Sequence, residues 1–383
     1  MKKQKNIPKL RFPEFEGEWE KKMINDTCTI VGGGTPESGK DEFWDGDIQW
    51  FTPTEIKMDY VSKSERTITE LGLKKSSARL LPKGTILLTS RATIGEVAIA
   101  LNECATNQGF QSLIVNKSYN NLFIFNWIKD NRHQFVRRAN GSTFLEISKS
   151  EIGKITICTP PLPEQQKIAS FFTAIDQKIF QLKRKLTLLE LYKKGVMQKI
   201  FSQEIRFKDD NGREFPKWEK KRLGDISNKK ASTISANTIE ENFGDYPIYG
   251  ATGFLKNVDF FLEENDYISI VKDGAGVGRL LYCEGNSSVL GTLDIIRPKK
   301  GINTYFLYLL LSQIDFTKFI TGSTIPHIYY KDYSKNSLLM PCQKEQTKIA
   351  NFLSVIDDKI NHTQKQIEKA EVWKKGLMQQ MFV

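Results

Sequence analysis

The feature that most constrains this chain is an internal repeat with a spacing of 181 residues. Glu164–Ala169 recurs as Glu345–Ala350, and Lys193–Gln198 recurs as Lys374–Gln379. Of the 38 positions from Glu164 to Phe201, 17 carry the same residue in both copies. Because a repeat at a fixed spacing is the signature of a duplicated structural unit, the sequence predicts two related halves.

Further shared pieces lie ahead of the repeated segments. Gly141–Thr143 corresponds to Gly322–Thr324, and a Phe-Pro pair followed by a tryptophan occurs near the start of each half, at Trp19 and Trp218. Between these anchors the halves differ in length and sequence. Common frames around divergent middle segments are typical of a duplicated module that keeps its scaffold while its exposed surface changes.

The repeated segments are predicted to form two long helices. In the first copy, apolar residues recur every seven positions from Ile168 to Val196, and a second series four residues further on is broken only by Lys193. The second copy follows the same frame, with weaker positions at Thr363 and Ala370. One such stripe ordinarily indicates a core helix, but two matched stripes favour a helix pair within the chain. At about 1.5 Å per residue, each helix would be roughly 57 Å long.

The segments before each helix are predicted to contain short strands. Residues 84–89 and 96–100 flank a turn, as do residues 267–271 and 279–282, and both arrangements are typical of hairpins. The amphipathic stretches Phe123–Val136 and Tyr305–Phe319 are each expected to form one packing helix. We therefore predict an α+β fold of two mixed α/β modules, residues 1–160 and 207–341, each followed by a long helix, residues 161–206 and 342–383.

Charge and composition favour a polyanionic partner. The 56 Lys and Arg residues exceed the 45 Asp and Glu residues and give a net charge of +11. Each basic side chain that meets a phosphate releases condensed counterions, so such a surplus suits nucleic acid. The basic clusters 183–185, 193–194 and 374–375 would touch DNA or an acidic partner, although a solvated helix face is the simpler interpretation.

Metal and membrane sites are not expected. The five cysteines and three histidines are scattered without zinc-ligand spacing, which suits a reducing cytoplasm. No apolar stretch follows Met1–Asn6, so no signal peptide is expected, and the longest apolar run, Tyr305–Leu311, is too short to span a bilayer. We predict a cytoplasmic protein with no metal site.

The segments that resemble catalytic motifs each lack a required residue. Gly34–Lys40 fits the first seven positions of a phosphate-binding loop, but Asp41 stands where a Ser or Thr must hold magnesium. Gly274–Gly278 is followed by Arg279 instead of the last small residue of a dinucleotide fingerprint. The chain also lacks the Asn/Asp-Pro-Pro-aromatic tetrapeptide of methyltransferases that act on exocyclic amines. The sequence therefore predicts no catalytic residues.

Five short segments of the sequence resemble segments of a known protein family. They are Pro161–Ala169, Gly141–Ile147, Gly33–Pro36, Ser90–Gly95 and Asn107–Phe110. With two variable modules, each followed by a long helix, the whole chain resembles the specificity subunit of a type I restriction-modification system. The second copy departs from the pattern, because Lys344 replaces the proline before Glu345 and Gly33–Pro36 has no clear counterpart.

The resemblance implies both an architecture and partners. Each module would be a target-recognition domain for one half of a bipartite DNA target, and the helices would form an antiparallel coiled coil with pseudo-two-fold symmetry that sets the spacing. Two methyltransferase subunits carrying S-adenosylmethionine and motor-nuclease subunits using ATP and magnesium would assemble on double-stranded DNA with this chain. The chain itself would hold no cofactor.

Residue type and turn position give candidate contact residues. Arg and Gln suit base edges, whereas Ser, Thr and Lys more often hold phosphate, and a structural role in a turn is an equal alternative for each. The DNA-binding candidates are Thr35, Lys40, Thr52, Thr54, Ser90, Arg91, Thr93, Asn107 and Gln108 in the first module, and Tyr249, Thr252, Lys272, Arg279, Thr292 and His327 in the second. The candidates for subunit docking are Phe171, Phe180, Leu188 and Phe352.

Two other functions remain open from the residues. A stand-alone sequence-specific DNA-binding protein, such as a repressor, would need no partner subunits. A nucleotide-dependent enzyme would depend on the Gly34–Lys40 loop, and loss of nucleotide binding on Lys40→Ala would be its required test.

Overall fold

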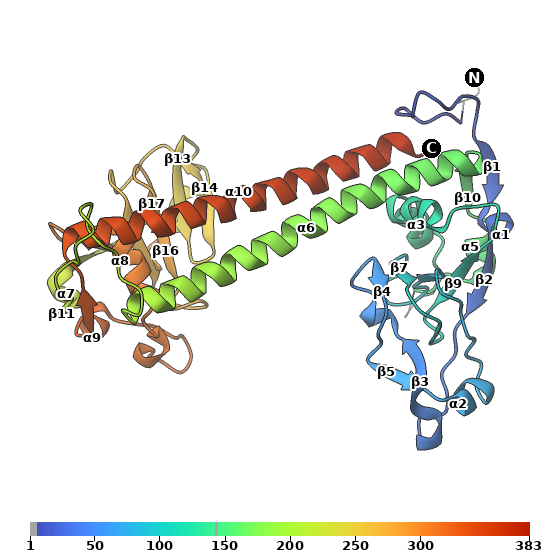
Figure 1. The fold of residues 1–383 in the computed structure, drawn as a ribbon, viewed down its shortest axis with the longest axis horizontal. Helices are drawn as coiled ribbons and strands as arrows, with labels where there is room; N and C mark the ends of the chain where they lie inside the picture. Colours follow the sequence, from blue (N-terminus) through green and yellow to red (C-terminus); the bar gives the residue numbers. More distant parts are fainter. Residues whose placement is uncertain (1–5, 142–144) are drawn as a thin grey trace. The chain divides into compact units, whose positions relative to one another are not determined.

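The computed structural model describes residues 6–141 and 145–383 (Figure 1). The chain divides into two compact units, which are described separately below. The first unit comprises residues 1–184 and 364–383, and the second comprises residues 185–363. Ser142 and Thr143, which the sequence places in the shared frame, lie outside the described residues.

The described residues of the first unit form three sheets. In the five-stranded sheet, the predicted hairpin is confirmed, because Ile86 pairs with Ile99 and Leu88 with Val97 in antiparallel register. The strands of this sheet, in spatial order, are β2 (Cys28–Gly32), β9 (Gln111–Val115), β6 (Ile86–Leu88), β7 (Val97–Ala100) and β4 (Tyr60–Val61). The smaller sheets are β5 (Arg66–Ile68), β3 (Trp44–Phe51) and β8 (Cys104–Thr106), and the pair β1 (Glu20–Met23) with β10 (Thr156–Thr159).

The predicted packing helix of the first unit is interrupted. Helix α3 (Asn121–Asp130) ends at Asn131, and α4 (Arg132–Arg137) begins directly afterwards. The side chain of Asn131 donates to the carbonyl of Trp127 and accepts from Gln134, which satisfies groups that a helix end leaves open. The expectation of one helix over 123–136 was therefore wrong. The shorter helices of this unit are α1 (Ile24–Thr27), α2 (Glu70–Lys74) and α5 (Lys149–Gly153).

The second unit repeats the plan with different strands. Its predicted hairpin is confirmed by the pairing of Ile268 with Tyr282 and of Ile270 with Leu280. The four-stranded sheet contains β12 (Ser227–Ala231), β18 (Leu293–Pro298), β15 (Tyr267–Val271) and β16 (Leu280–Cys283). The others are β14 (Gly253–Val258), β13 (Tyr246–Gly250) and β17 (Ser288–Val289), and the pair β11 (Glu219–Arg222) with β19 (Ser337–Met340).

The packing helix of the second unit is also shorter than predicted. Helix α8 (Thr304–Leu311) ends before Asp315, whose side chain caps the short turn η4 (Phe316–Phe319) by accepting from Thr317. The expected single helix over 305–319 was therefore wrong. Helices α7 (Leu223–Ile226) and α9 (Tyr330–Tyr333) complete the unit.

Two long helices, α6 (Leu162–Phe201) and α10 (Gln343–Met381), confirm the predicted stripes, and each contributes one end to each unit. In the first unit, Ile168 and Ile175 of α6 join the same core as Leu377 of α10. In the second unit, Ile200 of α6 joins the core of Ile349. Within each unit, the beginning of one helix packs beside the end of the other, so the helices run antiparallel there. Among the described residues, no helix has the length and apolar character needed to cross a membrane.

Candidate nucleic-acid interface

In each unit, a buried glutamate at the start of the long helix binds an arginine and a tryptophan from the segment that precedes the first strand of the unit. In the first unit, the carboxylate of Glu164 is fully buried, and it accepts two hydrogen bonds of 2.8 Å from Arg11 and one of 3.3 Å from Trp19. In the second unit, Arg206 and Trp218 donate to the equivalent Glu345 at 2.7–3.2 Å and 3.1 Å. A buried carboxylate needs such partners, and this explains why the glutamate is repeated.

The neighbouring glutamine connects the long helix to the packing helix. Gln165 donates to the carbonyl of Pro160 and accepts from the backbone N–H of Asn120, whose side chain caps α3. In the second unit, Gln346 binds Pro341 and Asn303 in the same way, and Asn303 caps α8. The repeated Glu-Gln doublet is therefore a structural frame under each module.

Lysine–aspartate pairs join the two long helices. Lys374 lies 2.5 Å from Asp176 in the first unit, and Lys193 lies 2.5 Å from Asp357 in the second. Their side chains are only 11% and 19% exposed, so the solvated helix face expected for these two lysines was wrong. Lys193 interrupts the apolar stripe because it faces a carboxylate on the partner helix. The Tyr305 hydroxyl also donates a hydrogen bond to Asp357. Burial is the main cause of the raised pKa of Tyr305, and the contact with Asp357 raises this pKa as well.

Each unit contains a corner where three segments meet, which we call the recognition corner. In the first unit it comprises residues 89–95, 107–111, 140–141 and 145–147. Ser90 donates its N–H to Gly109 and accepts from Ile147, and Asn140 and Glu146 exchange two backbone hydrogen bonds. Gly95, at φ +83°, closes the turn by donating to Thr89, and glycine suits this left-handed backbone.

The second recognition corner, residues 271–279, 290–294 and 321–328, has the same backbone contacts. Lys272 donates to Thr292 and accepts from Ile328, while Thr321 and His327 exchange two backbone hydrogen bonds. Gly278 donates to Val271 across the turn. The two corners therefore share one backbone plan and carry different side chains.

Most DNA-binding candidates of the first module lie on loops that contact this corner. The Thr35 hydroxyl donates to Gln108 at 2.5 Å, and Asn107 accepts from Gly109 within the corner. The hydroxyls of Thr52 and Thr54 lie 3.1 Å apart, on a loop joined to Asn107 through Phe51. Thr35, Thr54 and Gln108 are exposed, whereas Thr52 and Asn107 are half-buried.

The remaining candidates of the first module have unequal access. Ser90 is fully buried and its hydroxyl has no hydrogen-bond partner among the described residues, while Thr93 is exposed. Exposed Arg91 forms an ion pair with Glu146 at 2.9 Å. Lys40 stands apart from the corner, where it pairs with Glu37 at 3.3 Å.

The candidates of the second module also gather at their corner. Arg279 donates to the carbonyl of Ala251, beside exposed Thr252, and Tyr249 accepts from Leu290. Thr292 and Arg279 are exposed, while Tyr249, Lys272 and His327 are half-buried. Backbone hydrogen bonds thus link the segments that carry all six.

Close packing accounts for the glycines of the loop that resembles a phosphate site. A Cβ on Gly33 would lie 1.9 Å from the carbonyl oxygen of Asn107, and one on Gly34 would lie 2.2 Å from the Ser77 hydroxyl. Trp50 also donates to the carbonyl of Gly34. The residues after Lys40 form a three-residue turn, η1 (Asp41–Phe43), where a phosphate loop requires a helix.

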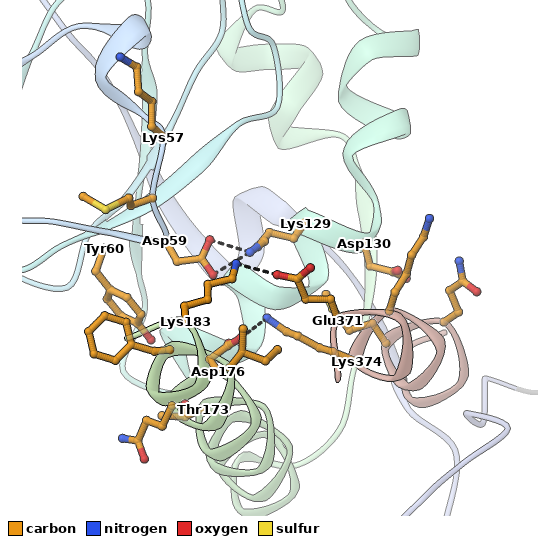
Figure 2. Close-up of a pocket in the computed structure, with 17 residues that line it drawn as sticks. Lys57, Asp59, Tyr60, Lys129, Asp130, Thr173, Asp176, Lys183, Glu371 and Lys374 are labelled. Carbon is orange, nitrogen blue, oxygen red and sulfur yellow. Dashed lines mark hydrogen bonds and ion pairs between the residues drawn. The ribbon is translucent and has the colours of Figure 1, made fainter. Parts of the chain in front are cut away.

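A cleft recurs at equivalent places beside the long helices. It measures about 990 Å³ in the first unit and about 520 Å³ in the second. Seven residues that line the first cleft each have an identical counterpart, 181 positions away in the sequence, that lines the second cleft. They are Asp176 and Asp357, Ile179 and Ile360, Glu190 and Glu371, Lys193 and Lys374, Lys194 and Lys375, Met197 and Met378, and Gln198 and Gln379. Figure 2 shows the first cleft, with ion pairs joining Lys374 to Asp176 and Lys183 to Glu371.

Comparison with known proteins identifies the family. The family model for the type I restriction modification DNA specificity domain matches residues 16–191 and 216–372. The chain belongs to this family of specificity subunits.

Individual relatives cover nearly the whole chain. The type I restriction enzyme MjaIX specificity subunit of Methanocaldococcus jannaschii is 30% identical, over 91% of this chain and 89% of its own. The EcoprrI specificity subunit of Escherichia coli is 25% identical, over 90% and 89%. The crystal structure of a type I S subunit from M. genitalium has the same fold, with a TM-score of 0.68 at 18% identity, covering 98% of this chain and 99% of that one.

The docking candidates of this specificity subunit fall into two groups. Phe180 and Leu188 are exposed on α6, and Phe180 lines the first cleft. Phe171 and Phe352 occupy equivalent positions, half-buried against Phe12 and Phe207 at 5.6 and 5.5 Å between ring centres.

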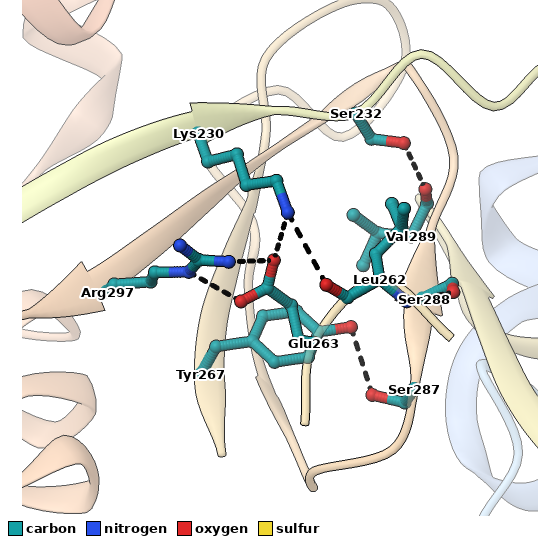
Figure 3. A network of polar contacts seen from close by, with 9 residues as sticks. All are labelled: Lys230, Ser232, Leu262, Glu263, Tyr267, Ser287, Ser288, Val289 and Arg297. Carbon is teal, nitrogen blue, oxygen red and sulfur yellow. Dashed lines mark hydrogen bonds and ion pairs between the residues drawn. The ribbon is translucent and has the colours of Figure 1, made fainter. Parts of the chain in front are cut away.

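A buried carboxylate organises the sheet of the second unit (Figure 3). Glu263 accepts from Arg297 of β18 at 2.5 and 2.6 Å and from Lys230 of β12 at 2.9 Å. Burial alone would raise the pKa of Glu263. The hydrogen bonds and charges of Arg297 and Lys230 together outweigh burial, so the pKa of Glu263 lies below its usual value. The network holds two neighbouring strands and a loop together.

Sequence reasoning missed several polar residues of the corners. Glu146, Gln111 and Asp294 were not among the candidates, although Glu146 pairs with Arg91 and Asp294 is buried beside Lys272. The available signal was positional: Glu146 and His327 lie 181 residues apart, so the choice of His327 pointed to its counterpart.

Proposed function

We propose that this specificity subunit reads a bipartite DNA target, with each module reading one half. The observation that carries the proposal is the pair of recognition corners, which share their backbone hydrogen bonds and differ in side chains. One scaffold with two surfaces suits two related tasks, namely the recognition of two different short sequences. The net charge of +11 supports a polyanionic ligand.

The corner side chains suit a division between positioning and reading. Arg91 and Arg279 are exposed and present planar donors that match guanine edges or phosphates. Exposed Gln108 offers the amide that suits adenine. Thr93 and Thr292 are exposed hydroxyls of the kind that hold phosphate. A stand-alone DNA-binding protein would use the same corners, so partner assembly separates the two functions.

We propose that the long helices set the gap between the two half-sites. The continuous runs of α6 and α10, each with one end in each unit, support this role. Inserting four residues after Leu182, with four more after the equivalent Thr363, should lengthen the gap in the recognised sequence. An unchanged gap in a map of methylated DNA would contradict the role of the helices.

The twin clefts support the docking of one partner twice. Their seven shared residues include Lys194, Lys375, Gln198 and Gln379, on helix surfaces where other positions have diverged. Two methyltransferase subunits are the partners that the family suggests. On this proposal they carry S-adenosylmethionine, the motor-nuclease subunits carry ATP and magnesium, and this chain leaves the chemistry to them.

Co-expression tests the proposal. The chain should co-purify with the methyltransferase encoded beside it, recognised by an Asn-Pro-Pro-Phe or Asn-Pro-Pro-Tyr motif, and the complex should methylate one defined split sequence. A matched variant, Lys375→Glu with Lys194→Glu, should release the methyltransferase while the chain stays folded. Specific DNA binding by the chain alone, without any associated methyltransferase, would favour the stand-alone function.

A further inference from the structure

One position on the shared backbone plan differs sharply in chemistry between the two recognition corners. Ser90 of the first unit and Lys272 of the second make the same two backbone hydrogen bonds, to Gly109 and Thr292 and from Ile147 and Ile328. Both residues are therefore held in place by their backbones on either side. A small neutral side chain in one unit is replaced by a long cation in the other.

The strand beside this position carries a second exchange. Gln111 and Asp294 each lie two residues after the residue that accepts the hydrogen bond from Ser90 or Lys272. A side-chain oxygen of each, Oε1 of Gln111 and Oδ1 of Asp294, is buried without a hydrogen-bond partner among the described residues. Native proteins satisfy most buried polar atoms, so two such oxygens at one place in two units indicate a functional position.

Asp294 is the more demanding of the two, because its buried side chain is a carboxyl group that lies between two lysines. Its side chain is 4% exposed, and the nearest charged groups are the ammonium of Lys229 at 3.5 Å and that of Lys272 at 3.7 Å. These contacts are ion pairs without a hydrogen bond to Oδ1. The buried hydroxyl of Tyr333 is a further titratable neighbour, and burial together with the charge of Asp294 raises the pKa of Tyr333.

The lysine side chains differ in how they relate to this carboxylate. Lys229 leaves from β12, while Lys272 leaves from the corner itself, where exposed Thr292 and Arg279 also lie. The Lys272 ammonium lies 3.7 Å from the Asp294 carboxylate, and 25% of the Lys272 side chain stays exposed to solvent. A buried charge that holds a cation in one direction reduces the freedom that the cation loses when it binds an anion.

We propose that Asp294 is a positioning residue that holds the Lys272 ammonium for contact with DNA in the second half-site. The first unit carries the neutral pair Ser90 and Gln111 at the same place and does not make this contact. The pair of positions therefore distinguishes what the two units recognise. This inference rests on the proposed function, because it names the residues by which one module contacts its half of the target.

The test measures the affinity of the complex, the full chain with its methyltransferase subunits, for a duplex that carries the target found by methylation mapping. Lys272→Ser should weaken binding about tenfold and lower the slope of log affinity against log salt by about one. Asp294→Asn should weaken binding about three- to fivefold when Lys272 is present, a smaller loss because the cation stays but is no longer held. In the double variant, Asp294→Asn should add nothing to the loss from Lys272→Ser.

The controls separate positioning from folding and from general charge. Lys318→Ser changes the net charge equally at an exposed lysine of the same unit and should leave affinity unchanged. Thermal unfolding of each variant identifies any loss caused by misfolding, and the reverse exchange Ser90→Lys offers a second measurement in the first unit, where affinity should not rise unless Gln111→Asp accompanies it.

Three results would overturn the inference. They are independent, multiplying effects of Asp294→Asn and Lys272→Ser, tighter binding by Asp294→Asn, or an equal loss from Lys318→Ser. A wild-type complex that binds no defined duplex would instead refute the proposed function itself, so the two failures are distinguishable.

Discussion

In the first unit, Glu164 accepts from Arg11 and Trp19, and in the second unit, Glu345 accepts from Arg206 and Trp218. At the recognition corners, by contrast, the same backbone carries Arg91 opposite Glu146 in one unit and Asp273 opposite His327 in the other. Duplication has therefore tolerated change unequally across the unit. The buried carboxylate of the frame and its partners stay the same in both units, whereas the paired residues of the corners have diverged, even to opposite charge.

The largest expected effect concerns the buried glutamates of the frame. Glu164→Gln and Glu345→Gln each leave an arginine without its charge partner, and loss of one member of a buried ion pair costs about 3–5 kcal/mol. The loss in free energy of unfolding should be similar for the two variants, as measured by chemical denaturation. A strong loss for one variant and none for the other would break the equivalence of the frames.

The network around Glu263 should make the second unit sensitive to acid. The pKa of Glu263 is lower in the folded state than its usual 4.5, so its contribution to stability is present above that pH and is lost as pH falls through the lower value. Glu263→Gln should reduce stability at neutral pH and flatten its decline below about pH 4.5. An unchanged acid profile in this variant, measured by thermal unfolding across pH, would contradict the role of the network in Figure 3.

The lysine–aspartate pairs of the long helices should have a smaller effect. Lys374→Met leaves Asp176 without its partner and should cost about 1–3 kcal/mol, because the pair is only partly buried. Lys193→Met should cost less, because Asp357 keeps its contact with the Tyr305 hydroxyl. Adding Asp176→Leu to Lys374→Met should restore most of the stability, since an apolar pair of similar size replaces a buried ion pair at little cost. A double variant no more stable than the single one would argue against the pairing.

The smallest effect on stability is expected at the first recognition corner. Arg91 is exposed and Glu146 is only half-buried, so their ion pair contributes less than about 1 kcal/mol. Exchanging them for the residues of the second unit, Arg91→Asp with Glu146→His, should leave the free energy of unfolding nearly unchanged. On the proposed function, the same exchange should alter the half-site that the first module reads. If this variant changed the free energy of unfolding but not the recognised sequence, the pair would belong to the structural frame and not to the DNA-reading surface.

The long helices and the hairpins were predictable because their signals are local and periodic. The stripe from Ile168 to Val196 can be read from spacing along the chain, and the hairpin can be read from two apolar runs, within residues 86–100, that flank a turn. The ends of the packing helices were not predictable from the apolar pattern, because the side chains of Asn131 and Asp315 cap turns inside it. Capping competes with helix continuation through single hydrogen bonds that periodicity does not record.

The candidate sites were predictable only in part. The candidates chosen by turn position include Thr35 with Gln108 and Lys272 with Thr292, and hydrogen bonds join the members of each pair. The repeat reveals equivalent residues but not partners, so Lys193 looked like a break in a stripe until Asp357 was found opposite it. Burial was equally hidden, because nothing in a Ser-Arg-Ala-Thr turn tells that Ser90 points inward while Arg91 points outward.

On the proposed function, each module reads one half of a split DNA target. Sequencing of methylated DNA from cells that express the chain with its methyltransferase tests it most directly, for the wild type and for the variant Lys272→Ser with Asp294→Gln. We predict two short specified sequences around an unspecified gap, with only one of them changed or relaxed in the variant. A single continuous target, or a variant that changes both sequences together, would contradict the claim.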